Sequence, residues 1–250
     1  MQLIQITPIQ ISNEILLHND LSVIILEAID RSQIEVQNGD ILVVTHKIVS
    51  KAEGRVVELD SIKPSTKAII MAKEHDKDPR IMELILKESS QILRAKNGII
   101  ISETRHGFVC ANAGVDQSNV KGDTAVLLPL APDESADRIM CAIKKKVGKE
   151  VAVIITDTFG RTFRNGQTNV AIGIAGINPI KSYIGTYDMY GRKLRVTEIA
   201  VADEIASASE LVMGKAEGTP VAIMRGYDFE KTSKASIKSL LRAKDRDLFR

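Results

Sequence analysis

The spacing of apolar residues changes several times along the chain, which predicts a mixture of strands and helices. Alternating apolar and polar residues predict a strand over 1–9, and unbroken apolar runs predict buried strands at 41–44 and 151–156. A glycine-broken apolar run at 170–177 predicts a strand that another part of the backbone approaches closely. Further strands are predicted at 99–102, 106–113 and 220–226.

Capping residues and helical periodicity predict the helices. Asp20 is placed to cap a helix over 21–29, and Gly148 follows a helix that runs from Asp133 to Lys146. Pro79 opens a helix whose apolar face consists of Ile81, Leu84, Ile85 and Ile92. The remaining helices are predicted to start at 64–65, to span 197–211 and to cover the basic segment 236–247.

The order of these elements indicates the fold class. Strands and helices do not alternate strictly, so we expect an α+β fold with mixed sheets and packed helices rather than a doubly wound sheet. The whole chain, 1–250, is expected to form one domain, and a two-lobed organisation with an unknown boundary remains open.

Composition narrows the class of protein. The 250 residues are 44% hydrophobic with a net charge of +2, and aromatics make up only 4% with no Trp, so nucleic acid is not an expected partner. Two cysteines, Cys110 and Cys141, cannot build a disulfide scaffold. No apolar run is long enough to span a bilayer, and the N-terminus does not read as a signal peptide. We therefore expect a cytoplasmic protein that does not bind membranes.

The first candidate site lies in the segment 113–119, which follows an apolar strand. Asp116 and Asn119 offer the carboxylate and amide oxygens that hard cations prefer. The alternative is an ordinary turn in which both side chains bind the local backbone.

The second candidate site lies in the segment 156–167. Asp157 and Thr158 follow a buried strand and can bind a metal ion, while Arg161 and Arg164 can clamp a phosphate or a carboxylate. The alternative is a turn at the end of the strand with two surface arginines. No glycine-rich kinase loop or nucleophile elbow accompanies this segment.

Two further loops carry residues that can bind phosphate. Lys51 lies in 45–55 after a buried strand, but no P-loop motif is present, and His46 in the same segment is as readily explained by a structural hydrogen bond. The glycines of 213–220 suit a helix end and a turn, or a mobile loop that covers a nucleotide or metal through Lys215 and Glu217. Asp116 and Asp157 together suit metal-assisted chemistry on phosphates, although sequence spacing does not show that they converge.

At these segments the sequence resembles the coenzyme F420-0:gamma-glutamyl ligases. The strings that carry the resemblance occur in order between about residues 39 and 226. They are DILVVTHKIVSKAEGR, CANAGVDQSN, VIITDTFGRTFRNGQ, AIGIAGI, YDMYGRKL, VADEIASASELVMGKAEGTPVA and MRG.

The resemblance implies a GTP-dependent ligase that adds L-glutamate to coenzyme F420-0 through gamma-linked amide bonds. An acyl phosphate would form first, and GDP and phosphate would be released. Mg2+ or Mn2+ would be required, and K+ would assist. The family's fold implies an intertwined homodimer with a cleft between the subunits.

The resemblance also implies roles for individual residues. Asp116, Asp157 and Thr158 would bind the metal, with Asp116, Asp157, Arg161 and Arg164 forming the catalytic set. Some relatives have an acidic metal ligand directly after Met-Gly, where this chain has Lys215, and Glu217 is the candidate substitute. Nucleotide contacts would come from Ser12, Asn13, Glu14, Ile15, His46, Lys47, Lys51, Asn119, Met213, Gly214, Lys215, Ala216, Glu217, Gly218 and Thr219.

Two alternatives remain open beside this ligase. The first is a related nucleotide- and metal-dependent amide ligase with a different acceptor. The second is a non-catalytic GTP-binding protein. A nucleic-acid binder would rest only on Lys144–Lys146 and the basic C-terminal segment.

Overall fold

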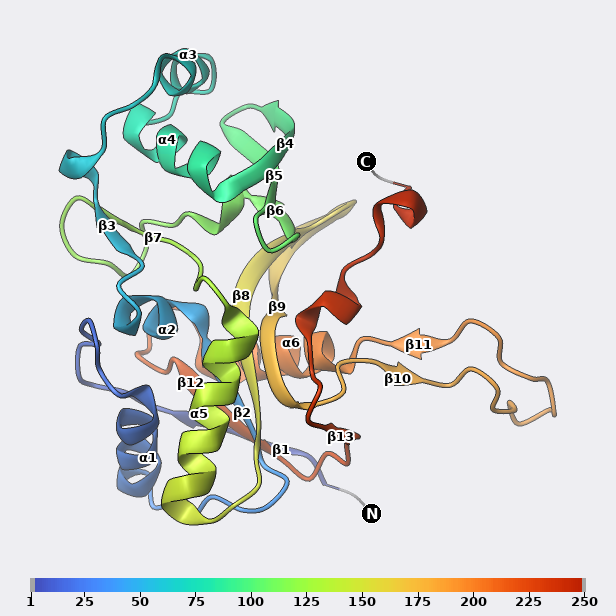
Figure 1. Ribbon diagram of the computed structural model, residues 1–250. Coiled ribbons are helices and arrows are strands. Elements are labelled where there is room, and N and C mark those ends of the chain that lie inside the picture. The colour runs from blue at the N-terminus through green and yellow to red at the C-terminus, as the bar shows by residue number, and fades with distance from the viewer. Residues whose placement is uncertain (1–2, 249–250) are drawn as a thin grey trace.

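A mixed sheet of six strands forms the centre of the computed structural model, which describes residues 3–248 (Figure 1). Strands β2 and β8 are parallel neighbours, and the other neighbouring pairs are antiparallel. The α+β class with mixed sheets is therefore confirmed. The strands, in their order across the sheet, are β1 (Gln5–Ile9), β12 (Val221–Arg225), β2 (Ile41–Thr45), β8 (Ala152–Arg161), β9 (Arg164–Ile177) and β13 (Lys231–Thr232).

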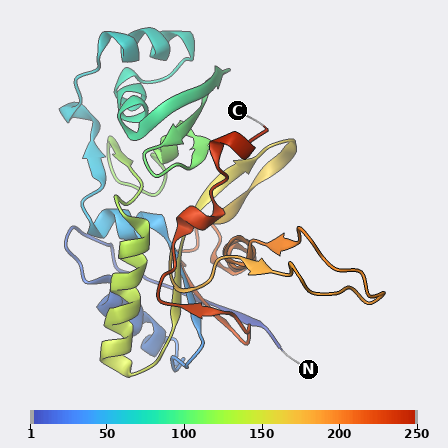
Figure 2. The same ribbon diagram turned by 45° about the vertical axis from the view of Figure 1, so that its right-hand side comes forward.

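Helices cover both faces of this sheet. Helices α1 (Leu21–Arg31) and α5 (Pro132–Val147) lie on one face, and α6 (Val201–Met213) lies on the other (Figures 1 and 2). The carboxylate of Asp20 accepts hydrogen bonds from the first backbone amides of α1, as its position predicts. Gly148 ends α5 with a φ of 69°, a left-handed conformation that glycine adopts without strain.

A smaller group of elements packs around a second hydrophobic core, above the sheet in Figure 1. Leu59, Met82, Ile85 and Ile100 are fully buried in it. A short ribbon of β3 (Val56–Glu58) and β7 (Thr124–Val126) connects this group to the main sheet. The group contains α3 (Thr66–Glu74), α4 (Pro79–Glu88) and a sheet of β4 (Ser89–Lys96), β5 (Ile99–Thr104) and β6 (Val109–Ala111).

The segment between β9 and α6 forms an arm that projects from the body (Figures 1 and 2). Its base is the pairing of β10 (Lys181–Ser182) with β11 (Glu198–Ile199). Large apolar side chains on the arm are exposed to solvent, namely Tyr187, Met189, Tyr190 and Val196. Such exposure is typical of a surface that contacts another molecule.

The glycines of 170–177 mark the close backbone approach that the sequence predicts. A Cβ atom on Gly173 would lie 2.5 Å from the backbone carbonyl carbon of Pro132, the first residue of α5. The neighbouring Asp133 accepts a hydrogen bond of 2.9 Å from the backbone amide of Ile174. Gly173 thus allows the start of α5 to rest directly on β9.

The predicted C-terminal helix over 236–247 is wrong. This segment instead contains two short 3-10 helices, η3 (Ile237–Leu240) and η4 (Lys244–Arg246). Ile237 is buried in the main core, whereas the Lys244 ammonium lies 3.1 Å from Glu103 of β5. A continuous helix rises only about 1.5 Å per residue, and the more extended path lets one short segment contact both the main core and strand β5 of the smaller group.

Four other sequence predictions need correction. Helix α4 ends at Glu88, so Ile92 belongs to β4 and not to the apolar face of that helix. Helix α6 begins at Val201 rather than at residue 197. The predicted strand over 106–113 is limited to β6, because the 3-10 helix η2 (Asn112–Gly114) follows it. Strand β8 does not end at Thr156 but continues into a long hairpin with β9.

Candidate functional site

The parallel pairing of β2 with β8 places two predicted site residues side by side. Thr45 and Thr156 are register partners, so the next residues, His46 and Asp157, emerge at the same edge of the sheet. The Nε2 atom of the buried His46 lies 3.2 Å from Oδ1 of Asp157, and its Nδ1 atom lies 3.3 Å from the Ser50 hydroxyl. The imidazole of His46 therefore lies between the Asp157 carboxylate and the Ser50 hydroxyl.

The next residue of helix α2 (His46–Ala52) binds the other predicted aspartate. The Lys47 ammonium lies 2.6 Å from Oδ2 of Asp116. The backbone amide and the hydroxyl of Ser118 each donate a hydrogen bond of 2.8 Å to the same carboxylate. Burial raises the pKa of Asp116, but the hydrogen bonds from Lys47 and Ser118 outweigh it and hold the pKa below its usual value.

The loop after Asp116 connects to the loop after α6. The Lys51 ammonium donates to the backbone carbonyl of Asn119 at 2.7 Å, and the Asn119 amide donates to the carbonyl of Lys215 at 3.3 Å. Burial lowers the pKa of Lys51, although the nearby Glu14 acts in the opposite direction. Three lysines therefore lie around the two aspartates, two of them from α2 and the third from the loop after α6.

Thr158 belongs to a closed ring of four side chains. The Lys215 ammonium donates to the Thr158 hydroxyl at 2.7 Å, and this hydroxyl donates to Oδ1 of Asn169 at 2.7 Å. The Asn169 amide donates to Oε2 of Glu210 at 2.6 Å, and Oε1 of Glu210 lies 2.7 Å from the Lys215 ammonium.

Sequence reasoning missed Asn169 and Glu210. The signal available for Glu210 was the polar face of the otherwise Ala-rich helix α6, where Asp203, Ser207 and Glu210 recur every three to four residues. All three side chains hydrogen-bond to β9. Asn169 faces Thr158 because the two are register partners in the β8–β9 hairpin.

The predicted N-terminal loop reaches the site through one side chain. The Glu14 carboxylate lies 2.6 Å from the Lys121 ammonium, and the Ile11 amide donates to the Gly218 carbonyl at 3.0 Å. Ser12 and Asn13 are exposed, whereas the side chain of Ile15 is buried in the main core. The loop therefore lies beside the 214–219 loop, but Ile15 offers only its backbone to a ligand.

Other predicted residues lie apart from this cluster. Arg161 and Arg164 face each other at the exposed tip of the β8–β9 hairpin, where Arg161 donates to the Asn165 carbonyl at 2.6 Å. Glu217 folds back on its own loop and accepts a hydrogen bond of 2.8 Å from the Ala216 amide. The predicted roles of these three side chains have no contact in this structure that supports them.

The side-chain oxygens of this site can bind a hard metal ion only if a ligand supplies further oxygens. Over residues 3–248, no group of three or more His, Cys, Asp or Glu side chains is placed to hold a metal ion by itself. Asp116, Asp157 and Thr158 nevertheless offer carboxylate and hydroxyl oxygens, the donors that Mg2+ and Mn2+ prefer. Mg2+ is commonly held by one or two carboxylates together with substrate phosphates, so this site fits a metal–nucleotide complex.

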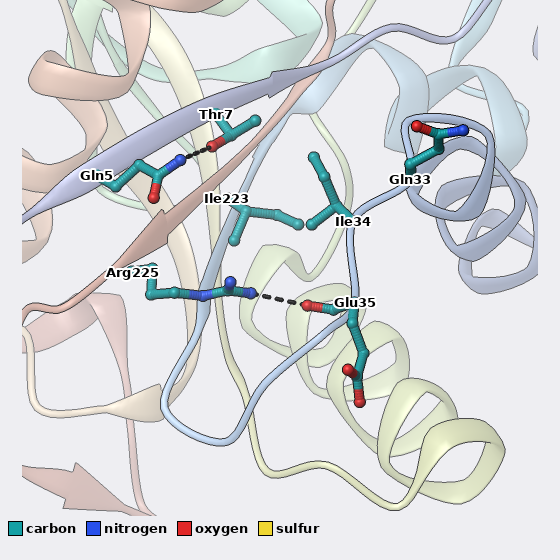
Figure 3. Close-up of a pocket in the computed structure, with 7 residues that line it drawn as sticks. All are labelled: Gln5, Thr7, Gln33, Ile34, Glu35, Ile223 and Arg225. Carbon is teal, nitrogen blue, oxygen red and sulfur yellow. Dashed lines mark hydrogen bonds between the residues drawn. The ribbon is translucent and has the colours of Figure 1, made fainter.

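Two cavities of the structure are lined by residues outside the cluster. One, of about 200 Å3, is lined by residues of β1, β12 and the loop after α1 (Figure 3). Arg225 in its wall binds the buried Asp40 at 2.7 Å and donates to the Glu35 carbonyl at 2.8 Å, so its charge is already satisfied. The second, of about 310 Å3, lies between α1, α5 and the end of α2.

Comparison with known proteins identifies the family. The profile of the F420-0:Gamma-glutamyl ligase family matches residues 10–226. The chain belongs to this family. It is 48% identical over 234 residues to the coenzyme F420:L-glutamate ligase of Methanothermobacter thermautotrophicus, covering 93% of each chain. The proteins of the same name from Methanocaldococcus jannaschii and Methanopyrus kandleri are 45% and 43% identical, over 88% and 98% of their own lengths.

Family membership confirms the resemblance and the prediction of a ligase. The matched region includes every predicted site residue, from Ser12 to Thr219, and ends before the segment that carries η3 and η4. Across residues 3–248, no helix combines the length and the apolar character needed to cross a membrane.

Proposed function

We propose that this chain uses GTP to add L-glutamate to coenzyme F420-0 through gamma-linked amide bonds. The observation that carries the proposal is the cluster in which His46 contacts Asp157 and Lys47 contacts Asp116, inside the region that the family profile matches. The name of the relatives, coenzyme F420:L-glutamate ligase, supplies the acceptor and the amine.

The proposed reaction has two steps. A carboxylate oxygen of the acceptor attacks the γ-phosphorus of GTP, which breaks the bond to the bridging oxygen and gives an acyl phosphate and GDP. The amine of glutamate then attacks the carbonyl carbon, phosphate leaves with the C–O bonding electrons, and the amine loses a proton. The first step is needed because a carboxylate is a poor electrophile until one of its oxygens becomes part of a leaving group.

The residues of the cluster have distinct proposed roles. Asp116, Asp157 and Thr158 would hold Mg2+ or Mn2+, which when bound withdraws charge from the phosphates. Lys47 and Lys51 would neutralise phosphate oxygens, and the part-buried position of Lys51 strengthens this attraction. GTP would also contact Asn119 and the loops 12–15 and 213–219.

The hairpin arginines and K+ complete the proposal. Arg161 and Arg164 would bind an anionic group of the acceptor or the nucleotide after the exposed hairpin tip has moved toward the site. K+ would assist as a monovalent cation beside the divalent ion.

We also propose that the chain forms an intertwined homodimer, and the exposed apolar residues of the arm support it. Tyr190 and Met189 are 82% and 88% exposed, which is unfavourable unless another surface covers them. Analytical ultracentrifugation should give twice the mass of one chain. Replacing both residues with glutamate should shift the mass to that of one chain, and an unchanged mass would exclude the arm as the interface.

The test of the reaction is a mass-spectrometric assay. The protein is incubated with coenzyme F420-0, L-glutamate and Mn2+, with GTP in one tube and ATP in another. A product heavier by glutamyl units in the GTP tube alone is expected. Asp157→Asn should lose this product, whereas Asp245→Asn, at an exposed position in the C-terminal segment, should keep it. Full activity of Asp157→Asn would contradict the role of the aspartate.

A further inference from the structure

The Lys215 ammonium occupies a position where the surrounding atoms are those of a cation site. It lies 2.7 Å from the Thr158 hydroxyl, 2.7 Å from Oε1 of Glu210 and 3.3 Å from Oδ1 of Asn169. These three oxygens are a hydroxyl, a carboxylate and an amide carbonyl, which are hard donors that bind Mg2+ and Mn2+ as well as ammonium groups.

The oxygens are held in place by the protein rather than by the lysine alone. Asn169 is buried, and its amide nitrogen donates to the second oxygen of Glu210 at 2.6 Å, which fixes Oδ1 toward Thr158 and Lys215. The Thr158 hydroxyl donates to this Oδ1 and accepts from the ammonium, which leaves one of its two lone pairs for the metal ion that it would share with Asp116 and Asp157. Removing the lysine would therefore leave a preformed set of oxygens with one negative charge.

Lys215 itself is less constrained than the oxygens that it contacts. Its side chain is 59% exposed, whereas that of Glu210 is 23% exposed. The ammonium therefore enters the ring from the solvent side, from the loop that follows α6. It neutralises the carboxylate in the same way that a bound metal ion would, but without needing to be recruited from solution.

We propose that Lys215 acts as a built-in cation, which fills a divalent-ion position formed by Thr158, Asn169 and Glu210. The chain would then bind one divalent ion fewer than these oxygens permit. Glu210 and Asn169 are positioning residues of this arrangement, because they hold the lysine and the Thr158 hydroxyl rather than the reacting groups. The inference deepens the proposed function, since it concerns the cations of the same site, but it does not depend on the identity of the acceptor.

The test counts Mn2+ ions without measuring catalysis. Free Mn2+ is followed by electron paramagnetic resonance while the full chain is titrated, so the number bound per chain is obtained directly. Lys215→Ala should bind one more Mn2+ than the unmodified chain. Lys67→Ala, which removes an exposed lysine from α3, should not change the number.

A double variant shows where the additional ion is bound. Glu210→Gln combined with Lys215→Ala should lose the extra Mn2+, because the carboxylate that would hold the ion has gone. An unchanged number in Lys215→Ala, or an extra ion that survives Glu210→Gln, would overturn the inference. Circular dichroism of each variant should match that of the unmodified chain, since Lys215 is exposed and contributes to neither core.

The outcome separates this inference from the proposed function. If the unmodified chain and Lys215→Ala both bind Mn2+ in equal number, only the built-in cation is wrong. If the unmodified chain makes no glutamylated product but Lys215→Ala still gains an ion, the inference stands and the proposed reaction fails.

Discussion

The imidazole of His46 reaches Asp157 at 3.2 Å because the two residues follow paired positions of parallel strands. His46 is 2% exposed, and its other ring nitrogen is near the Ser50 hydroxyl at 3.3 Å. The ring is therefore held from both sides, and it fixes one oxygen of Asp157. Such outer contacts orient a metal-binding carboxylate and tune its affinity.

We predict that His46→Ala weakens Mn2+ binding by about 10–100-fold, the usual cost of removing such a supporting contact. Isothermal titration with Mn2+ measures the change. In His46→Gln the side-chain amide can still donate to Asp157, so most of the affinity should return. Equal weakening in both variants would mean that the effect comes from packing and not from the polar contact with Asp157.

Asp116 links stability to pH through its contacts with Lys47 and Ser118. Burial raises its pKa, but the hydrogen bonds lower it by more, so the folded chain holds the carboxylate in its ionised form more strongly than the unfolded chain does. A lowered pKa contributes stability above the unfolded value, and this contribution is lost as the pH falls through the folded value. The pair is part-exposed, so solvent screening limits its contribution to below about 1 kcal/mol.

The corresponding prediction concerns Asp116→Asn. Its free energy of unfolding should be lower than that of the unmodified chain at pH 7, and the two should converge as the pH is lowered from 5 toward 3 (roughly the range in which carboxylates titrate). Urea unfolding at several pH values gives the comparison. A difference that stays constant with pH would show that the Asp116 charge does not stabilise the fold.

The contact between Gly173 and Pro132 predicts a large effect from one methyl group. A Cβ atom at position 173 would meet backbone atoms of Pro132 at 2.5–2.6 Å, and backbone yields less readily than a flexible side chain. Gly173→Ala should therefore force α5 away from β9 and reduce the free energy of unfolding by about 1–3 kcal/mol, as overpacking typically does. Thermal and urea unfolding measure this change.

Gly160→Ala provides the control for that variant. A Cβ atom at Gly160 would meet no neighbouring atom within 4 Å, so the stability should change little. If Gly173→Ala were as stable as the unmodified chain, the close packing of α5 on β9 would be wrong.

Local signals in the sequence predicted those parts of the fold that depend on neighbouring residues. The cap at Asp20, the stop at Gly148 and the close approach at Gly173 each follow from the chemistry of one position. The segment 236–247 shows the limit of such reasoning. Its helical spacing of apolar residues is real, but Ile237 packs into the main core while Lys244 binds Glu103 of the smaller group, and those distant contacts decide its path.

The site was predictable to the same extent. The residue types after apolar strands could be selected, namely His46, Lys47, Asp116 and Asp157. Only the parallel register of β2 and β8, however, places His46 beside Asp157. Asn169 could not be selected, because nothing in its local sequence distinguishes it. Its importance comes from its pairing with Thr158 across the hairpin.

The two cysteines should differ strongly in reactivity. Burial raises the pKa of the Cys110 thiol to about 12, and the negative charge of nearby Asp157 adds to this. Cys141 is exposed on α5, although burial and Asp137 raise its pKa as well. Because the thiolate is the reactive form, Cys110 should be inert in the folded chain at neutral pH.

Titration with a chromogenic disulfide should therefore detect one thiol per folded chain and two after unfolding in guanidinium. The Cys141→Ser variant should show no rapid reaction when folded and one thiol when unfolded. Rapid reaction of that variant in its folded state would mean that Cys110, and with it the strand beside Asp157, is open to solvent.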